Sequence, residues 1–284
     1  MEQKKQAVER AKANAPGDQL RPIGADGQIV SPTSQKLARP TDPNANINHS
    51  ASATPLNWVK LNWAHLEQRR IVAHNVADPR SKAFDMLRTQ VLQVMDQKNW
   101  KFLAITSPTE GCGKTVTAIN LALSIARQPE RSALLIDLDL QRPSVADNLG
   151  LKSRQGIQAV LEGRSNPLET VIRADANSCE LLVLPSEAST FHSSELMASR
   201  NMDILLQDIK RTFRSHMVIF DMPPLLQGDE VLATLPRVDA VLLVTAVGVS
   251  TVHEVKECNK HLQASEVIRV VLNKSNETVG RHYY

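Results

Sequence analysis

The stretch FLAITSPTEGCGKTVTAINLALSIA, residues 102–126, decides the fold that we expect for this chain. It opens with a short apolar run, FLAITS, which is typical of a strand buried on both faces. A helix is predicted from Lys114 to Arg127, because apolar residues recur there at helical spacing. Between the two lie Gly111 and Gly113, which can adopt backbone conformations that other residues avoid. The stretch therefore predicts a strand, a tight loop and a helix in succession.

The same alternation of strand and helix continues on both sides of this stretch. Short runs of Val, Ile and Leu are separated by amphipathic segments, which indicates strands buried on both faces of a parallel sheet. We therefore predict a doubly wound α/β domain, a mostly parallel sheet flanked by helices. The further strands are predicted at 133–137, 181–184, 218–221, 240–245 and 268–272, and the further helices at 81–97, 202–213 and 252–263.

The loop between the predicted strand and helix carries the groups that bind phosphate. Backbone N–H groups of such a loop, together with a helix N-terminus, attract phosphate oxygens. Lys114 can reach the outer phosphates of a nucleotide, and the Thr115 hydroxyl can ligate Mg²⁺. The first glycine of the usual pattern is missing, since position 108 is proline. We assign to this cradle Glu110, Gly111, Cys112, Gly113, Lys114, Thr115 and Val116.

Acidic residues follow two of the other predicted strands. Asp137 and Asp139 come directly after one apolar run, and Asp221 ends another. Because parallel strands end at the same edge of a sheet, where ligands bind, these carboxylates should converge near the loop. Carboxylates there would serve both Mg²⁺ and an attacking hydroxyl. The alternative interpretation is that they are turn residues or helix caps.

The composition fits a soluble globular protein, with 42% hydrophobic residues, 22% charged residues and a formal net charge of +3. That charge is too small to indicate nucleic acid as a partner. The cysteines lie far apart without metal-ligand spacing, which favours a reducing compartment. We find neither a signal-peptide core nor an apolar run long enough to span a membrane, so we expect a cytoplasmic protein.

Three segments are expected along the chain. Residues 1–55 are rich in Pro, Asn, Gln, Ser and Ala and poor in aliphatic residues, so they should form a disordered N-terminal arm. Residues 56–280 should form the α/β domain. A short tail, 281–284, contains the only two tyrosines of the chain, Tyr283 and Tyr284.

Three motifs now resemble those of one family. SPTEGCGKT (107–115), LLIDLDLQRPS (134–144) and VIFDMPP (218–224) are similar to the Walker A, Walker A′ and Walker B motifs of the bacterial tyrosine autokinases, or BY-kinases. These are P-loop NTPases of capsule and exopolysaccharide biosynthesis. Flanking sequences such as AFDMLRTQ (83–90) also resemble the family, so the similarity covers about residues 58–284.

The resemblance implies an ATP-dependent protein-tyrosine autokinase that regulates polysaccharide polymerisation and export. By that resemblance Lys114 and Thr115 would bind ATP and Mg²⁺. Asp137 and Asp221 would position the metal, directly or through water. By the same resemblance, Asp139 would handle the proton of the tyrosyl hydroxyl.

The resemblance also implies an adenine contact, an acceptor and partners. Asn273 would bond adenine, unless it is only a turn residue at a strand end. Tyr283 and Tyr284 would accept phosphate, usually on the tail of a neighbouring copy, unless they simply end the chain. The chain would then be a homo-oligomer. A membrane-embedded co-polymerase or activator would bring it to the inner membrane.

The chain departs from the family pattern at three places. Glu110 and Cys112 replace a proline and a glutamate of the usual loop. Gln141 stands where an arginine is expected after the paired acids. The helix pattern E-x-x-R-x-x-R, which docks neighbouring subunits, begins here with Lys82 and Asp85, so its first two charges are reversed.

Two rival interpretations follow. The departures favour a scaffold protein that binds ATP but transfers phosphate poorly. A partitioning-type ATPase of the same superfamily would carry a signature lysine early in the loop, where this chain has Thr109, and a glycine at position 110. A test for phosphotyrosine after incubation with Mg-ATP separates the kinase from the scaffold.

Overall fold

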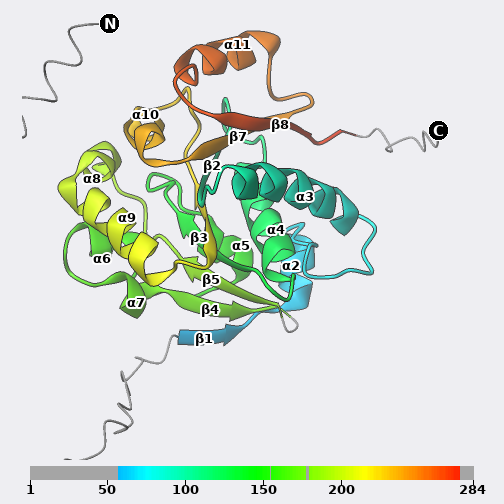
Figure 1. The fold of residues 1–284 in the computed structure, drawn as a ribbon, viewed down its shortest axis with the longest axis horizontal. Coiled ribbons are helices and arrows are strands. Elements are labelled where there is room, and N and C mark those ends of the chain that lie inside the picture. The colour runs from blue at the N-terminus through cyan, green and yellow to red at the C-terminus, as the bar shows by residue number, and fades with distance from the viewer. Residues whose placement is uncertain (1–56, 154, 177–178, 276–284) are drawn as a thin grey trace, which may run out of the picture. The chain divides into compact units, whose positions relative to one another are not determined.

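The computed structural model describes residues 57–153, 155–176 and 179–275. Within them the chain forms one sheet with helices on both faces (Figure 1), which confirms the predicted doubly wound α/β fold. The predicted arm (1–55), the tail (281–284) and the exact ends of the domain lie outside the described residues.

The sheet has the strand order β1-β4-β5-β3-β6-β2-β7-β8 over the described residues. All neighbouring strands run parallel except β4 and β5, which are antiparallel. The strands are β1 (Asn57–Lys60), β2 (Phe102–Thr106), β3 (Ser132–Asp137), β4 (Ile172–Asp175), β5 (Glu180–Leu184), β6 (His216–Asp221), β7 (Ala240–Ala246) and β8 (Val267–Asn273).

The helices cover the sheet in two layers, each with its own buried apolar cluster. Those of one layer include α3 and α4, and those of the other include α9 and α11 (Figure 1). The helices are α2 (Trp63–Gln68), α3 (Ser81–Gln97), α4 (Lys114–Ala126), α5 (Val145–Leu149), α6 (Ile157–Leu161), α7 (Pro167–Thr170), α8 (Ser193–Ala198), α9 (Arg200–Thr212), α10 (Glu230–Thr234) and α11 (Val252–His261), with a 3₁₀ turn at Leu235–Arg237.

The central strands explain why their sequences are continuously apolar. In β2, Leu103 and Ile105 belong to the cluster under α3 and α4, whereas Phe102 and Ala104 belong to the opposite cluster. Successive side chains of a strand point to opposite faces, so a strand covered on both sides needs apolar residues at every position. The predicted strands and helices are confirmed with shifts of a few residues at their ends, and α3 has the predicted bounds.

The sheet departs from the prediction at its two edges. The expectation that every strand is buried on both faces is wrong for β8, where Val270 and Leu272 are 56% and 60% exposed. β8 is an edge strand, and these two side chains lie on a part of its face that the described residues leave uncovered. The short strands β1 and β4 were not predicted; they pair with each other at the opposite end of the sheet.

The α3 helix is fastened to α4 by a cluster of charged side chains. Asp85 accepts hydrogen bonds from Ser124 Oγ at 2.7 Å and from Arg88 at 3.1 Å, and also pairs with Arg127. Arg88 donates in turn to the Ser124 carbonyl oxygen at 3.0 Å. Two of the three residues in the docking pattern therefore hold helices together within the chain. Of that pattern, Lys82 is exposed, whereas Asp85 and Arg88 are partly buried.

Asn120, in the middle of α4, holds the segment that leads into α3. Its Oδ1 accepts from the backbone N–H groups of Val72 and Ala73 at 2.8 and 2.9 Å. Its Nδ2 donates to the carbonyl oxygens of Arg70 and Val116 at 3.0 and 2.8 Å. The side chain is fully buried, so no water can take over these bonds.

Replacing Asn120 with alanine should lower the free energy of unfolding by about 3 kcal/mol, because buried N–H and C=O groups would lose their partners. Urea unfolding of the purified protein measures this effect. Asn259, exposed on α11, provides the matched control. Its replacement by alanine should change stability by less than about 0.5 kcal/mol. Equal stability of the two variants would show that the Asn120 bonds contribute nothing.

Candidate functional site

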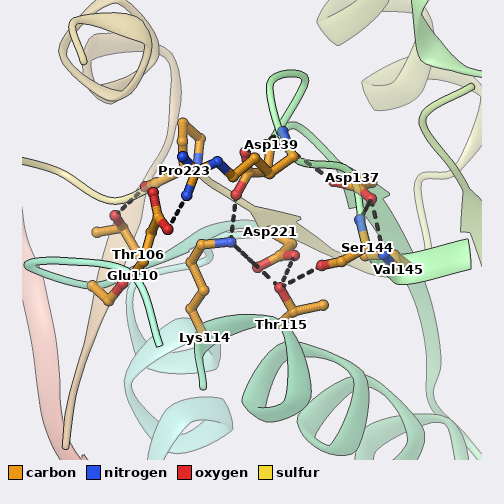
Figure 2. A network of polar contacts seen from close by, with 12 residues as sticks. Thr106, Glu110, Lys114, Thr115, Asp137, Asp139, Ser144, Val145, Asp221 and Pro223 are labelled. Carbon is orange, nitrogen blue, oxygen red and sulfur yellow. Dashed lines mark hydrogen bonds and ion pairs between the residues drawn. The ribbon is translucent and has the colours of Figure 1, made fainter. Parts of the chain in front are cut away.

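The carboxyl ends of β2, β3 and β6 bring the predicted loop and the acidic residues to one place. In Figure 2, Lys114 and Thr115 point from the start of α4 toward Asp139 and Asp221. β3 and β6 pair in register, so Asp137 and Asp221 are opposite each other at the strand ends. The convergence expected from the parallel sheet is therefore present in the fold.

Lys114 is held by two carboxylates. Its Nζ lies 2.7 Å from Asp139 Oδ2 and 3.9 Å from Asp221 Oδ1. Burial alone would lower the pKa of this amine, but the charges of Asp221 and Asp139 outweigh it and raise the pKa above its usual range. The amine is therefore charged at physiological pH and is turned toward the centre of the site.

Thr115 and Asp221 form the second contact of the site. Thr115 Oγ1 donates to Asp221 Oδ2 at 2.7 Å and accepts from Ser144 Oγ at 3.1 Å. The other oxygen, Asp221 Oδ1, is buried and has no hydrogen-bond partner among the described residues. A buried acceptor with a free lone pair beside a threonine hydroxyl fits a hydrated Mg²⁺, which takes oxygen ligands.

Asp137 has a different set of partners. Its Oδ2 accepts from the backbone N–H groups of Ser144 and Val145, both at 3.0 Å, and its Oδ1 accepts from Asp139 N at 3.2 Å. These bonds are those of a turn and helix-cap residue, the alternative that the sequence left open. They hold the chain after β3 against the start of α5. Within the described residues, no group of three or more His, Cys, Asp and Glu side chains is arranged to hold a metal.

The loop itself has free hydrogen-bond donors. Within the described part of the chain, none of the backbone N–H groups of residues 110–116 donates a hydrogen bond. Gly111 and Gly113 have φ values of +75° and +89°, which orient the loop in a way that favours glycine. A row of unpaired N–H groups that runs into a helix N-terminus is the arrangement that binds phosphate.

Asn273 supports this loop from the end of β8. Its Nδ2 donates to the Cys112 carbonyl oxygen at 2.9 Å, and its Oδ1 accepts from Lys274 N at 2.8 Å. A Cβ on Gly113 would lie 2.3 Å from Asn273 Nδ2, so this approach requires glycine. The Cys112 thiol is buried and lies 3.3 Å from Ser250 Oγ. An adenine contact of Asn273 stays a prediction, as do the acceptor roles of Tyr283 and Tyr284, which lie outside the described residues.

The structure adds polar contacts that sequence reasoning missed. Gln141 Nε2 donates to Glu230 Oε1, and the same oxygen accepts from Ser193 Oγ at 2.7 Å. Glu230 is 2% exposed and makes no ion pair with any described residue. Gln141 thus contacts a buried carboxylate at the position where the family pattern has arginine. In the sequence, only the departure from the family pattern at residue 141 pointed to this contact.

Burial makes the acids at the strand ends harder to ionise. Burial, with the charge of Asp221 next in importance, raises the pKa of Asp137 to about 7. Burial also raises the pKa of Asp221 to about 6, although Lys114 and the Thr115 hydroxyl act in the opposite direction. Both carboxyl groups ordinarily titrate at 3.8.

Without bound ligands, the protein should lose stability as the pH rises from about 4 to about 7. Both acids bind their proton more tightly in the folded chain than in the unfolded chain. Proton binding therefore stabilises the fold at low pH, and this stabilisation is lost as the pH rises from the unfolded pKa values to the folded ones. Urea midpoints at pH 5 and pH 8 should show a drop on the order of a few kcal/mol in the free energy of unfolding.

The matched protein for this experiment carries Asp137→Asn and Asp221→Asn together. His74 and His216, whose pKa values burial lowers, give the opposite slope, but they are present in both proteins. The difference between the two pH profiles therefore isolates the acids. Identical profiles would contradict the prediction.

Comparison with known proteins agrees with this geometry. A ParA family model, described as the NUBPL iron-transfer P-loop NTPase, matches residues 98–279. The tyrosine-protein kinase CpsD of Streptococcus pneumoniae is 31% identical over 186 residues, which are 64% of this chain and 79% of CpsD. The chain belongs to the P-loop NTPases and, within them, to the bacterial tyrosine kinases.

Two further bacterial tyrosine kinases show which part of such proteins this chain resembles. EpsB of Ralstonia nicotianae, a putative tyrosine-protein kinase, is 27% identical over 259 residues, which are 87% of this chain and 34% of EpsB. The chain thus spans about a third of the length of that relative. The kinase domain of the Escherichia coli tyrosine kinase Etk has a TM-score of 0.65 at 25% identity, and the match covers 75% of this chain and 84% of that kinase-domain chain.

The matched region of the P-loop NTPase family model, residues 98–279, includes the loop of residues 107–115. The departures at Glu110, Cys112 and Gln141 do not prevent the P-loop geometry, since the loop keeps Gly111, Gly113, its unpaired N–H groups and Lys114. No helix in the described residues is both long and apolar enough to cross a membrane.

Proposed function

We propose that the chain is a protein-tyrosine kinase that transfers the γ-phosphoryl group of ATP, with Mg²⁺, to Tyr283 and Tyr284 on the C-terminal tail of a neighbouring copy. One observation carries the proposal: Lys114 and Thr115 contact Asp139 and Asp221 beside a loop of unpaired N–H groups. The similarity to CpsD supports the reaction class.

The site residues would act by positioning and by charge stabilisation. The N–H groups of residues 110–116 would hold the phosphate oxygens, and Lys114 would leave Asp139 to bind the outer phosphates. Asp139, released from the amine, would accept the proton of the tyrosyl hydroxyl while the new O–P bond forms and the bond to ADP breaks. Mg²⁺, when bound, would neutralise part of the phosphate charge.

The proposed ligands of the metal are Thr115 and Asp221, directly or through water. Asp221 Oδ1 supports this because it is buried without a hydrogen-bond partner among the described residues. Asp137, whose oxygens accept backbone N–H bonds, would position the metal through water and keep the strand-end loop in place. Asn273, whose Nδ2 donates to the Cys112 carbonyl oxygen, would contact adenine.

The proposed biological role is regulation of exopolysaccharide or capsule polymerisation and export. Phosphate on the tail adds negative charge, which would loosen a homo-oligomer and so switch the export machinery. A membrane-embedded co-polymerase would activate the kinase and recruit it from the cytoplasm to the inner membrane. The resemblance to the tyrosine autokinases supports this role. The subunit contact should differ from the family's, because Asp85 and Arg88 are engaged within the chain.

Purified protein incubated with Mg-ATP and probed for phosphotyrosine tests the proposal. We expect labelling that disappears when Tyr283→Phe and Tyr284→Phe are combined, while each single variant keeps part of the signal. Calorimetry with the same protein measures ATP binding independently. Magnesium-dependent ATP binding without any phosphotyrosine would favour the scaffold interpretation instead.

A further inference from the structure

An ion pair joins the P-loop to the loop after β3. Glu110 of the P-loop pairs with Arg142, three residues after Asp139. Both side chains reach solvent, with 46% and 66% of their surfaces exposed. The close view of the site draws both Glu110 and Lys114 (Figure 2). The family loop has proline at position 110, so this pair is a property of the present chain.

The backbone fixes Arg142 at the same centre as Lys114. Arg142 N donates to Asp139 Oδ1 at 3.1 Å, and Asp139 Oδ2 lies 2.7 Å from Lys114 Nζ. One carboxylate therefore holds the P-loop lysine and the turn from which the arginine side chain extends. The contact with Glu110 joins the guanidinium to the first residue of the row of unpaired N–H groups at 110–116.

Glu110 is a poor neighbour for a triphosphate. Its own N–H belongs to the phosphate-binding row, so its carboxylate stands close to where phosphate charge would collect, and like charges repel. Arginine binds phosphate oxygens in a bidentate manner at least as well as it binds a carboxylate. An exposed ion pair contributes little stability, so exchanging one partner for another is easy.

We propose that Arg142 is a phosphate-binding residue of this site that exchanges Glu110 for the terminal phosphate of ATP. Glu110 then acts as a competitor that keeps the arginine in place while the site is empty. The exchange favours a triphosphate over a diphosphate, since only the longer chain supplies the third phosphate. This inference rests on the proposed function of the site as an ATP site.

Isothermal titration calorimetry with Mg-ATP and Mg-ADP tests the exchange in the full-length protein. The variants are Arg142→Gln, Glu110→Gln and the two combined. Arg142→Gln should weaken ATP binding about tenfold and ADP binding less than about twofold, as expected for one charge-assisted phosphate contact. Glu110→Gln should tighten ATP binding several-fold in the presence of Arg142, because the competitor and its repulsion are both gone.

The ratio of ATP to ADP affinity is the deciding quantity. It should fall about tenfold with Arg142→Gln whether residue 110 is Glu or Gln. Arg142→Lys should keep the ratio between those of the wild type and Arg142→Gln. Arg211→Gln, which removes an exposed ion pair with Asp208 on α9, is the matched control and should leave the ratio unchanged. An unchanged ratio in Arg142→Gln would overturn the proposal, as would ATP binding that Glu110→Gln fails to tighten. Wild-type protein that binds neither nucleotide would instead refute the proposed function itself.

Discussion

Lys114→Met should reduce tyrosine phosphorylation by a factor of about 10³ or more. The amine is the cation closest to the strand-end acids, and it would be the main positive charge on the outer phosphates. Loss of one preorganised contact of this kind removes several kcal/mol of transition-state stabilisation. Single-turnover assays with radiolabelled ATP measure the rate directly.

The control for Lys114→Met is Lys256→Met, on the exposed face of α11. It removes the same charge from an exposed position and should leave the phosphorylation rate within about twofold of the wild type. ATP affinity of Lys114→Met should also fall, so measurements at several ATP concentrations separate binding from transfer. A Lys114→Met protein with near-normal phosphorylation would remove this lysine from the mechanism.

Asp221→Asn should have effects of opposite sign on activity and on stability. Activity should fall by a factor of about 10² to 10³, because the carboxylate that would bind Mg²⁺ and hold Thr115 loses its charge. The ligand-free protein should become more stable at pH 8 by about 2 kcal/mol, since burial of the ionised group, with its pKa raised to about 6, no longer opposes folding.

The stability gain in Asp221→Asn should shrink to less than about 1 kcal/mol at pH 4, because the carboxyl is then protonated in the folded wild type and largely protonated in the unfolded chain. Thermal melts at the two pH values, without nucleotide and magnesium, show this directly. Asp208→Asn on the surface of α9 is the matched control and should change stability by less than about 0.5 kcal/mol at either pH. An Asp221→Asn protein that is less stable than the wild type at pH 8 would contradict the prediction that the buried, ionised carboxylate opposes folding.

Much of the fold was predictable because its strongest patterns are local. The apolar periodicity of α3 is sustained over several turns, and its predicted bounds agree with the structure. β2 and α4 flank a glycine loop, which separates the two kinds of pattern clearly. β1 and β4 were missed because each has only four residues and carries polar side chains. The exposure of β8 depends on its place in the sheet, and the strand order is a long-range property.

The sequence also predicted which residues of the site lie close together, but not how each of them is used. The rule that parallel strands end at one edge brought Lys114, Thr115, Asp139 and Asp221 together correctly. The rule could not tell how each carboxylate is used, and Asp137 turned out to accept backbone N–H groups of residues seven and eight positions later. Glu230 was out of reach for a different reason. It meets Gln141 across 89 residues of sequence, from a helix of five residues that leaves no strong pattern.

The open side of β8 has a consequence for handling this protein. Among the described strands β8 pairs only with β7, so its other side offers unpaired backbone donors and acceptors next to the exposed side chains of Val270 and Leu272. An extended segment of another molecule can pair with such an open edge strand, and this pairing is one way in which sheet proteins begin to aggregate. A lysine at position 270 or 272 should therefore raise the concentration at which the protein remains monodisperse, at no expense to the nucleotide site.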